Sequence, residues 1–175
     1  MKSHQSGFTL VELLVTVAIV AVLASLAVPS FRTMLVKRSV QAAADTFVSD
    51  MRYARSEAIK RSARVSVCRS STGTSCSLVG GLWKEGWIVF VDADGDGAFD
   101  AGDEIVRVQQ GLTTIDSVTP DRSLSFTFQP TGFAKSATQT FLFTPPGSDG
   151  ASFARVACVS MQGRAALRAE GETTC

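Results

Sequence analysis

The stretch SGFTLVELLVTVAIVAVLASLAVPSF, residues 6–31, decides how this chain is organised. Residues 8–28 are apolar or small apart from two threonines, one serine and one glutamate. About 20 apolar residues, at a rise of about 1.5 Å each, form a helix long enough to cross the hydrocarbon core of a bilayer. The stretch therefore predicts a membrane-spanning helix over residues 8–30, preceded by a short polar leader at residues 1–7.

A secretory signal peptide is the simpler alternative for an apolar N-terminus. Its apolar region usually has about 7–15 residues and ends in a cleavage site of small residues. The run in this chain is longer, and no clear A-x-A-like site precedes Pro29. We therefore expect the apolar helix to remain in the mature protein.

Glu12 is the one acid within this apolar run. A carboxylate at the centre of a membrane helix costs about 2.5–3.5 kcal/mol on insertion scales, so such a residue is a functional candidate that needs a partner. No basic residue lies within helical reach of Glu12 in the run. The partner is expected from another chain. If the chain is cut after Gly7, the new α-amine of Phe8 on a neighbouring copy can supply it.

The segment GFTLVELL, residues 7–14, resembles the type IV prepilin motif. The resemblance implies that a dedicated peptidase cuts between Gly7 and Phe8 and that Phe8 is then N-methylated. It also implies that Glu12 aligns subunits during filament assembly. Pro29 matches the helix-kinking proline that is common near the end of pilin membrane segments. A plain signal anchor is the alternative, and it leaves the acid unexplained.

Length and charge fit one small exported domain on a helical stalk. The chain has 175 residues and a net charge of +1, and about 100–200 residues make one domain. Removal of Lys2 with the leader leaves 16 basic and 16 acidic residues. Overall charge therefore gives no reason to expect nucleic-acid binding, which only a local patch can supply.

The four cysteines indicate the compartment. Cys68 and Cys76 bracket a short Ser/Thr/Gly loop, and Cys158 and Cys175 bracket the tail. Of three possible connectivities the adjacent pairing is the simplest, and each closed loop contributes about 3 kcal/mol in the chain-entropy model. Zinc would need closer cysteines or nearby histidines, whereas the only histidine, His4, lies in the leader. We expect two disulfides and therefore an oxidising periplasm or cell surface.

The basic residues beside the apolar run predict a cytoplasmic C-terminal domain, which is the opposite of what the cysteines indicate. Lys2 precedes the run, whereas Arg32, Lys37 and Arg38 follow it, and the positive-inside rule would then keep the C-terminal domain in the cytoplasm. The cysteines and the resemblance outweigh this count, because pilin precursors insert with the leader inside. We expect a single-pass protein of the inner membrane with a periplasmic C-terminal domain.

Residues 31–62 are predicted to continue the same helix in amphipathic form. Apolar residues recur at spacings of three to five, at Leu35, Val40, Ala44, Phe47, Met51, Ala54 and Ala58. These spacings trace one face of a helix, and a face of this kind usually packs on the core of its own domain.

From residue 63 onward the pattern indicates β-strands. The segments are RVSVC, GWIVFVD, EIVRVQ, LSFTFQ, QTFLFT and ARVACVS, separated by clusters of Gly, Pro, Ser and Asp. In LSFTFQ, the side chains of Leu124, Phe126 and Phe128 are expected to share one face. The predicted fold class is α+β, with the long N-terminal helix packed on a mainly antiparallel β-domain at residues 63–175.

This second half resembles the GspH/FimT group of minor pilins and pseudopilins. The matching segments are YARSEAIKR at residues 53–61, the hairpin GWIVFVDADGDGAFDAGDEIVR at residues 86–107 and the late GR at residues 163–164. The resemblance implies a pilin-like fold and a structural subunit that initiates or caps a type IV pilus or a type II secretion pseudopilus. It implies other pilin subunits and the prepilin peptidase/methyltransferase as partners.

No constellation of catalytic residues is visible in the sequence. Without His4 there is no histidine to act as a base, and disulfide-bonded cysteines cannot act as nucleophiles. A hydrolase using the carboxylates between Asp92 and Glu104 is conceivable, but a turn or an ion-binding loop explains those acids more simply. The protein is therefore predicted not to be an enzyme, which leaves structural assembly and ligand binding as the competing classes.

The tail segment GRAALR, residues 163–168, is a candidate DNA-binding site. Competence-type pilins of this family share a late G-R-x-R motif that contacts DNA. Gly163 and Arg164 match it, Ala166 replaces the second arginine, and Arg168 is displaced by two positions. In a strand Arg164 and Arg168 would share a face and could bridge phosphates, with weak and salt-sensitive affinity. An ordinary solvated hairpin is the alternative.

The acidic hairpin DADGDGAFDAGDE has the spacing of a calcium-binding loop. Positions 1, 3, 5, 9 and 12 are taken by Asp92, Asp94, Asp96, Asp100 and Asp103, and position 6 by Gly97. Position 12 normally holds a bidentate glutamate, and the flanking segments are predicted strands, not the helices of an EF-hand. Asp-Gly pairs also form turns without an ion. Calcium binding and a plain acidic turn both remain open.

Overall fold

The computed structural model describes residues 8–77, 82–120, 124–147 and 150–175. These residues form two compact units, residues 1–36 and residues 37–175. A single helix, α1 (Leu10–Arg61), contributes to both units, and each unit is described by itself.

The first unit is the apolar half of α1. This helix is long and apolar enough to cross a membrane, and its described side chains up to residue 35 are exposed. Leu35 was predicted to be on the buried stripe, but it is 51 % exposed. The prediction was wrong because the buried stripe of α1 begins only at Val40. The helix continues through position 29, whose proline side chain lies outside the described residues.

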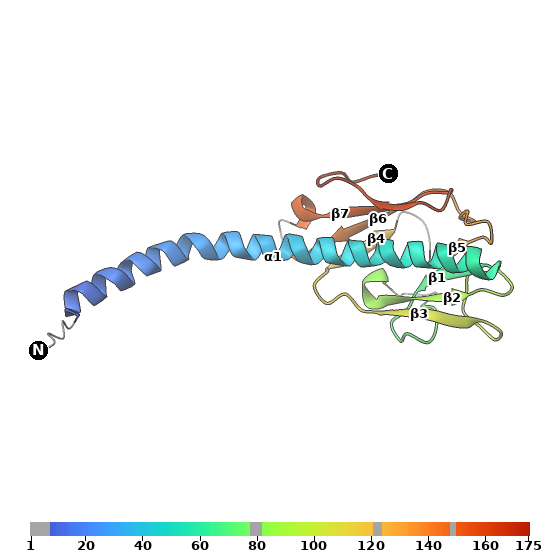
Figure 1. Cartoon of the computed structure of the whole chain (residues 1–175), viewed down its shortest axis with the longest axis horizontal. Coiled ribbons are helices and arrows are strands. Elements are labelled where there is room, and N and C mark those ends of the chain that lie inside the picture. The colour runs from blue at the N-terminus through green and yellow to red at the C-terminus, as the bar shows by residue number, and fades with distance from the viewer. Residues whose placement is uncertain (1–7, 78–81, 121–123, 148–149) are drawn as a thin grey trace, which may run out of the picture. The chain divides into compact units, whose positions relative to one another are not determined.

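The second unit contains two antiparallel four-stranded sheets, which Figure 1 shows beside the second half of α1. The first sheet has the order β3-β2-β1-β5, formed by β3 (Glu104–Gln110), β2 (Gly86–Val91), β1 (Val65–Arg69) and β5 (Ser125–Phe128). The second has the order β4-β6-β7-β8, formed by β4 (Ser117–Pro120), β6 (Gln139–Thr144), β7 (Arg155–Val159) and β8 (Ala165–Leu167). The six predicted strands are all present, and β4 and β8 were not predicted.

The core of this unit forms where α1 packs on both sheets. The predicted stripe is confirmed from Val40 onward, because Val40, Ala44, Phe47, Met51, Ala54 and Ala58 are all fully buried. The Phe47 ring lies 5.3 Å from that of Trp87 on β2 and 4.5 Å from that of Phe141 on β6, measured between centroids. One helical side chain therefore contacts both sheets.

The residues around β5 correct a second prediction. Phe126 and Phe128 are fully buried and their ring centroids are 5.0 Å apart, as expected for one face of a strand. Leu124 is 46 % exposed, because β5 begins at Ser125. Leu124 therefore does not share the buried face.

Asp50 is a buried acid on the packed face of α1. Its side chain is almost completely buried and accepts a hydrogen bond of 2.9 Å from the indole Nε1 of Trp87. Arg107 on β3 forms an ion pair with the same carboxylate at 3.1 Å. Burial raises the pKa of Asp50, whereas the indole hydrogen bond and then the charge of Arg107 act in the opposite direction.

Candidate functional site

The N-terminal end of α1 gives Glu12 a local role. Thr9 precedes the helix, and its hydroxyl oxygen accepts a hydrogen bond of 3.2 Å from the Glu12 N–H. The Glu12 carboxylate in turn accepts a hydrogen bond of 3.5 Å from the Thr9 N–H. This reciprocal pair is a capping box, which sequence reasoning missed although the T-x-x-E spacing signals it.

Beyond the capping box, no cation among the described residues pairs with the Glu12 carboxylate. The contact from the Thr9 N–H is longer than the usual 2.7–3.2 Å of an N–H···O bond and involves a neutral donor. Phe8 and Glu12 are both described, whereas Gly7 lies outside the described residues, so cleavage between Gly7 and Phe8 remains a prediction.

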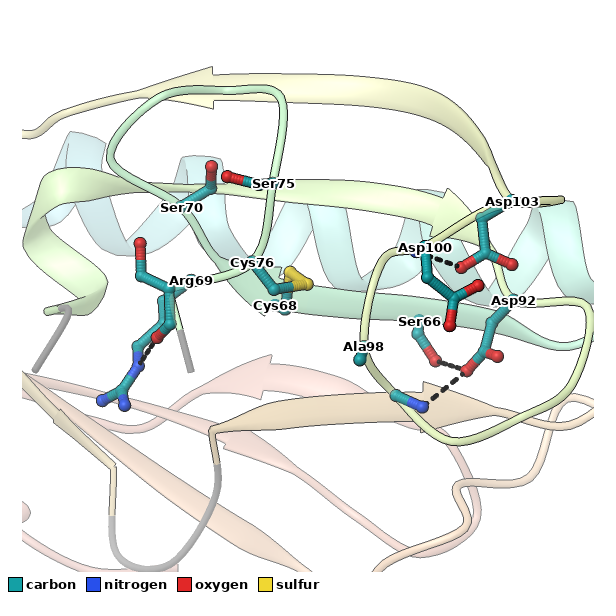
Figure 2. Close-up of a disulfide and its surroundings, with 12 residues drawn as sticks. Ser66, Cys68, Arg69, Ser70, Ser75, Cys76, Asp92, Ala98, Asp100 and Asp103 are labelled. Atoms are coloured by element: carbon teal, nitrogen blue, oxygen red, sulfur yellow. Dashed lines mark hydrogen bonds between the residues drawn. A yellow bond between two sulfur atoms is a disulfide. The ribbon is translucent and has the colours of Figure 1, made fainter. Parts of the chain in front are cut away.

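The acidic loop between β2 and β3 is organised around the buried carboxylate of Asp92. One oxygen accepts the Gly95 N–H at 2.6 Å, and the other accepts the Gly97 N–H at 3.1 Å. The hydroxyl of Ser66 on β1 donates to the same carboxylate at 2.6 Å, as Figure 2 shows. Gly97 has a φ of +84°, a backbone conformation that suits glycine. The sequence pattern did not reveal the role of Ser66.

Three of the five predicted calcium ligands lie together. Asp92, Asp94 and Asp96 each place one carboxylate oxygen within 4.8 Å of the others. Calcium binds oxygen at about 2.3–2.6 Å, so two ligands of one ion lie at most about 5 Å apart, and this spacing fits.

The other two predicted ligands lie in the second half of the loop. Asp103 accepts backbone hydrogen bonds from Ala93 at 2.9 Å and from Asp100 at 3.2 Å, which closes the loop (Figure 2). Partial desolvation raises the pKa of the Asp100 carboxyl, and the negative charges of the four other aspartates add to this shift. The loop thus concentrates negative charge that a cation would stabilise.

If the loop binds calcium and does not merely form an acidic turn, calcium should raise the melting temperature of the full-length protein in detergent micelles, because an ion that binds only the folded loop stabilises it. At a concentration about 100 times the Kd, this stabilisation is about 2.7 kcal/mol. The Asp94→Ala variant should melt at the same temperature with and without calcium. Thermal unfolding in calcium, in magnesium and in chelator measures the effect. A wild-type melting curve that calcium does not move would leave the plain acidic turn.

The tail places Arg164 and Arg168 on either side of β8. Both line one hollow of about 380 Å³ beside the C-terminal disulfide. The guanidinium of Arg168 donates to the Cys175 carbonyl oxygen at 2.7 Å and lies 3.7 Å from the Glu172 carboxylate. The structure therefore brings the two predicted arginines together, but part of the Arg168 charge is already balanced.

Gly163, the first residue of the late GR motif, is required by the packing. Its φ is +75°, and a Cβ added there would overlap the carbonyl oxygen of Gly132. The glycine of this motif is therefore explained by the close approach of two turns, without reference to a ligand.

The two predicted disulfides are confirmed. Cys68 on β1 is bonded to Cys76 in the following loop, as Figure 2 shows. Cys158 on β7 is bonded to Cys175. Each bond therefore joins a strand to a segment outside the strands.

Known proteins resemble this chain over most of its length. Residues 43–163 match the family described as Type II transport protein GspH, and residues 2–28 match the prokaryotic N-terminal methylation motif. The pilin-like protein PilA1 of Thermus thermophilus is 30 % identical over 168 residues, which cover 92 % of this chain and 97 % of that protein. The type IV major fimbrial protein FimA of Dichelobacter nodosus is 45 % identical over 40 residues, which cover 23 % of this chain and 26 % of that protein.

Solved structures share the fold. The type IV minor pilin FimU of Pseudomonas aeruginosa superposes with a TM-score of 0.60 at 22 % identity, covering 77 % of this chain and 92 % of FimU. The minor pseudopilin EpsH from the type 2 secretion system of Vibrio cholerae gives a TM-score of 0.54 at 13 % identity, covering 77 % of this chain and 99 % of EpsH. The chain has a type IV pilin-like fold and belongs to the GspH family of pilin-like proteins.

Proposed function

We propose that this protein is a structural subunit, and not an enzyme, that initiates or caps a type IV pilus or a type II secretion pseudopilus. The observation that carries the proposal is Glu12, an acid in the first turn of an exposed apolar helix within the matched methylation motif. Prepilin peptidase would cut between Gly7 and Phe8, and Phe8 would be N-methylated. The helix would then anchor the protein in the inner membrane, with the β-domain in the periplasm.

Assembly would give Glu12 a cation that none of the described residues of its own chain supplies. The Glu12 carboxylate lies in the first turn of α1. There the α-amine of Phe8 on a neighbouring copy, or the α-amine of another pilin, can pair with it inside the apolar environment. The two disulfides agree with an oxidising compartment such as the periplasm.

The Glu12→Ala variant is expected to be exported and cleaved normally but to enter filaments poorly. Loss of an ion pair worth at least ~1.4 kcal/mol would lower incorporation by about tenfold or more. The measurement compares the variant in sheared and purified filaments with the amount of processed protein in the membrane.

The Thr9→Ala variant is the matched control for this test. It removes the other half of the capping box and keeps the carboxylate, so its incorporation should remain close to that of the wild type. Equal losses in the two variants would mean that Glu12 acts only as a helix cap. Normal incorporation of Glu12→Ala would refute the assembly role.

A competence-type minor pilin that binds DNA is the alternative function. The observation in its favour is that Arg164 and Arg168 line the same hollow. The Glu172 carboxylate near Arg168 weakens this alternative. Duplex binding depends on several protein cations that are free to pair with the phosphates of the DNA backbone. A gel-shift series with the full-length protein and duplex DNA at rising salt tests this alternative, and binding by the Arg164→Ala/Arg168→Ala variant equal to that of the wild type would exclude it.

A further inference from the structure

A second hollow, which we call the arginine hollow, lies between α1 and the turn that precedes β8. It has a volume of about 360 Å³, and its lining includes Arg52, Arg55, Ile59, Gly163 and Arg164. Two of the arginines come from neighbouring turns of the helix and the third from a segment more than 100 residues further along the chain. The fold thus assembles the cluster.

The arginine hollow carries an unbalanced positive charge. Three of its lining residues are arginines, and none of the described residues that line it is acidic. Arg52 donates from Nε to the Ala165 carbonyl oxygen at 3.1 Å, which fixes its side chain without neutralising its charge. Guanidinium groups held in this way are suited to a carboxylate or a phosphate oxygen.

Arg55 carries a guanidinium charge that an anion bound in the hollow would offset. Its Nε is buried and has no hydrogen-bond partner among the described residues. A Cβ added to Gly132 or to Gly163 would lie 3.1 Å from this nitrogen, so the two glycines cover it and offer no acceptor there. A buried donor without an acceptor is costly, and the cost is greater for a charged group. An anion entering from the hollow would offset the charge of this side chain.

The surroundings of the arginine hollow favour a protein over a nucleic acid. Ile59 lines the hollow and is 49 % exposed. Phe133 directly follows Gly132 and Met161 lies two residues before Gly163, and their side chains are 51 % and 52 % exposed. Arginine, methionine and aromatic residues are enriched where proteins bind one another. A DNA backbone would instead require a row of free cations, whereas Arg168 already contacts Glu172.

We propose that the arginine hollow binds a carboxylate side chain of a neighbouring filament subunit. This inference rests on the proposed assembly function, because it assumes such a neighbour. The acidic side chain would enter between Arg55 and Arg164, and the exposed apolar side chains would contact the surface around it. This polar contact would add to the pairing of Glu12 in the apolar helix.

The test uses the 15N-labelled full-length protein in detergent micelles and a blocked Asp-Leu-Asp tripeptide as the probe. The Nε–H of Arg55 is shielded from water, so its NMR signal should persist and report on the hollow. The acidic peptide is expected to shift this signal in a saturable manner. A blocked Asn-Leu-Asn peptide, equal in size but uncharged, should leave it unmoved.

Two variants locate the binding. Arg164→Gln removes an exposed guanidinium from the hollow and should weaken peptide binding by about tenfold, the range expected for one charged hydrogen-bond partner. Arg38→Gln makes the same chemical change on the same helix, away from this hollow, and should leave binding unchanged. If the Arg55→Gln variant folds, its peptide binding gives a second test. That binding can be measured from the backbone amide signals around Gly163.

The remaining outcomes would overturn the proposal. They are no shift with the acidic peptide, equal shifts with both peptides, or equal losses in Arg164→Gln and Arg38→Gln. Stronger binding of a 12-base-pair duplex than of the acidic peptide would assign the hollow to nucleic-acid phosphates, and saturation by inorganic phosphate alone would assign it to a free anion. No filament is needed, so failure here is distinct from failure of the Glu12 prediction.

Discussion

Replacing Phe47 with alanine is expected to lower the free energy of unfolding of residues 37–175 by about 3–5 kcal/mol. Phe47 is fully buried, and its ring contacts aromatic rings of both sheets and of the short 3₁₀ helix η1 (Trp83–Glu85). Its removal would leave a cavity where α1, β2 and β6 meet. Because small domains are stable by only about 5–15 kcal/mol, this loss is a large part of the total.

Tryptophan fluorescence of the full-length protein measures this effect during thermal or urea unfolding. Trp83 and Trp87 both pack on Phe47, so their emission reports on the site of the change. The melting temperature should fall by about 10–20 °C. Phe133→Ala is the matched control, because it makes the same substitution at an exposed position. A similar loss in both variants would show that Phe47 does not join the sheets as described.

Replacing Asp50 with alanine is expected to cost about 2–4 kcal/mol. The change leaves the buried indole N–H of Trp87 without its acceptor and removes the ion-pair partner of Arg107. Asp50→Asn should cost less, because an amide oxygen can still accept the indole hydrogen bond. Urea unfolding of the two variants and the wild type compares these losses. Equal stability of Asp50→Ala and the wild type would contradict the role of the buried carboxylate.

The pH dependence gives a second test of Asp50. Its pKa in the folded protein is raised above the ordinary value, so the folded state binds the proton more tightly than the unfolded state does. Ionisation of Asp50 therefore lowers stability as pH rises from its unfolded pKa through its folded pKa. Across that window Asp50→Asn should gain stability relative to the wild type, and the difference should then level off. A difference that moves in the opposite direction would mean that the pairing with Arg107 outweighs burial.

The helix and most of the strands could be predicted because their side chains repeat regularly. The apolar run and the stripe that begins at Val40 have helical spacing, and six segments are rich in β-branched and aromatic residues. Strands β4 and β8 were missed for a physical reason. Ser117–Pro120 ends in proline and pairs with β6 further along the chain, whereas Ala165–Leu167 has only three residues, none of them β-branched, and forms through its pairing with β7.

The candidate sites were predictable only in part. The prepilin motif and the acidic loop are continuous in sequence, so their residues could be named in advance. The buried Asp50 has a weak signal, because it lies three residues after Phe47 and four before Ala54, on the packed face of the helix. The arginine hollow has almost no signal in the sequence. Arg52 and Arg55 have the spacing of a solvated helical face, and only the folded chain brings Arg164 to them.

The positions of the two disulfides have a mechanical consequence. Cys68–Cys76 belongs to the first sheet and Cys158–Cys175 to the second, so neither bond crosses from one sheet to the other. Under a pulling force within residues 37–175, the sheets would be held to each other and to the helix by noncovalent packing around Phe47 and by the chain connections. Oxidation would therefore protect the loop and the tail from fraying, while the resistance of the domain to tearing would depend on its aromatic core.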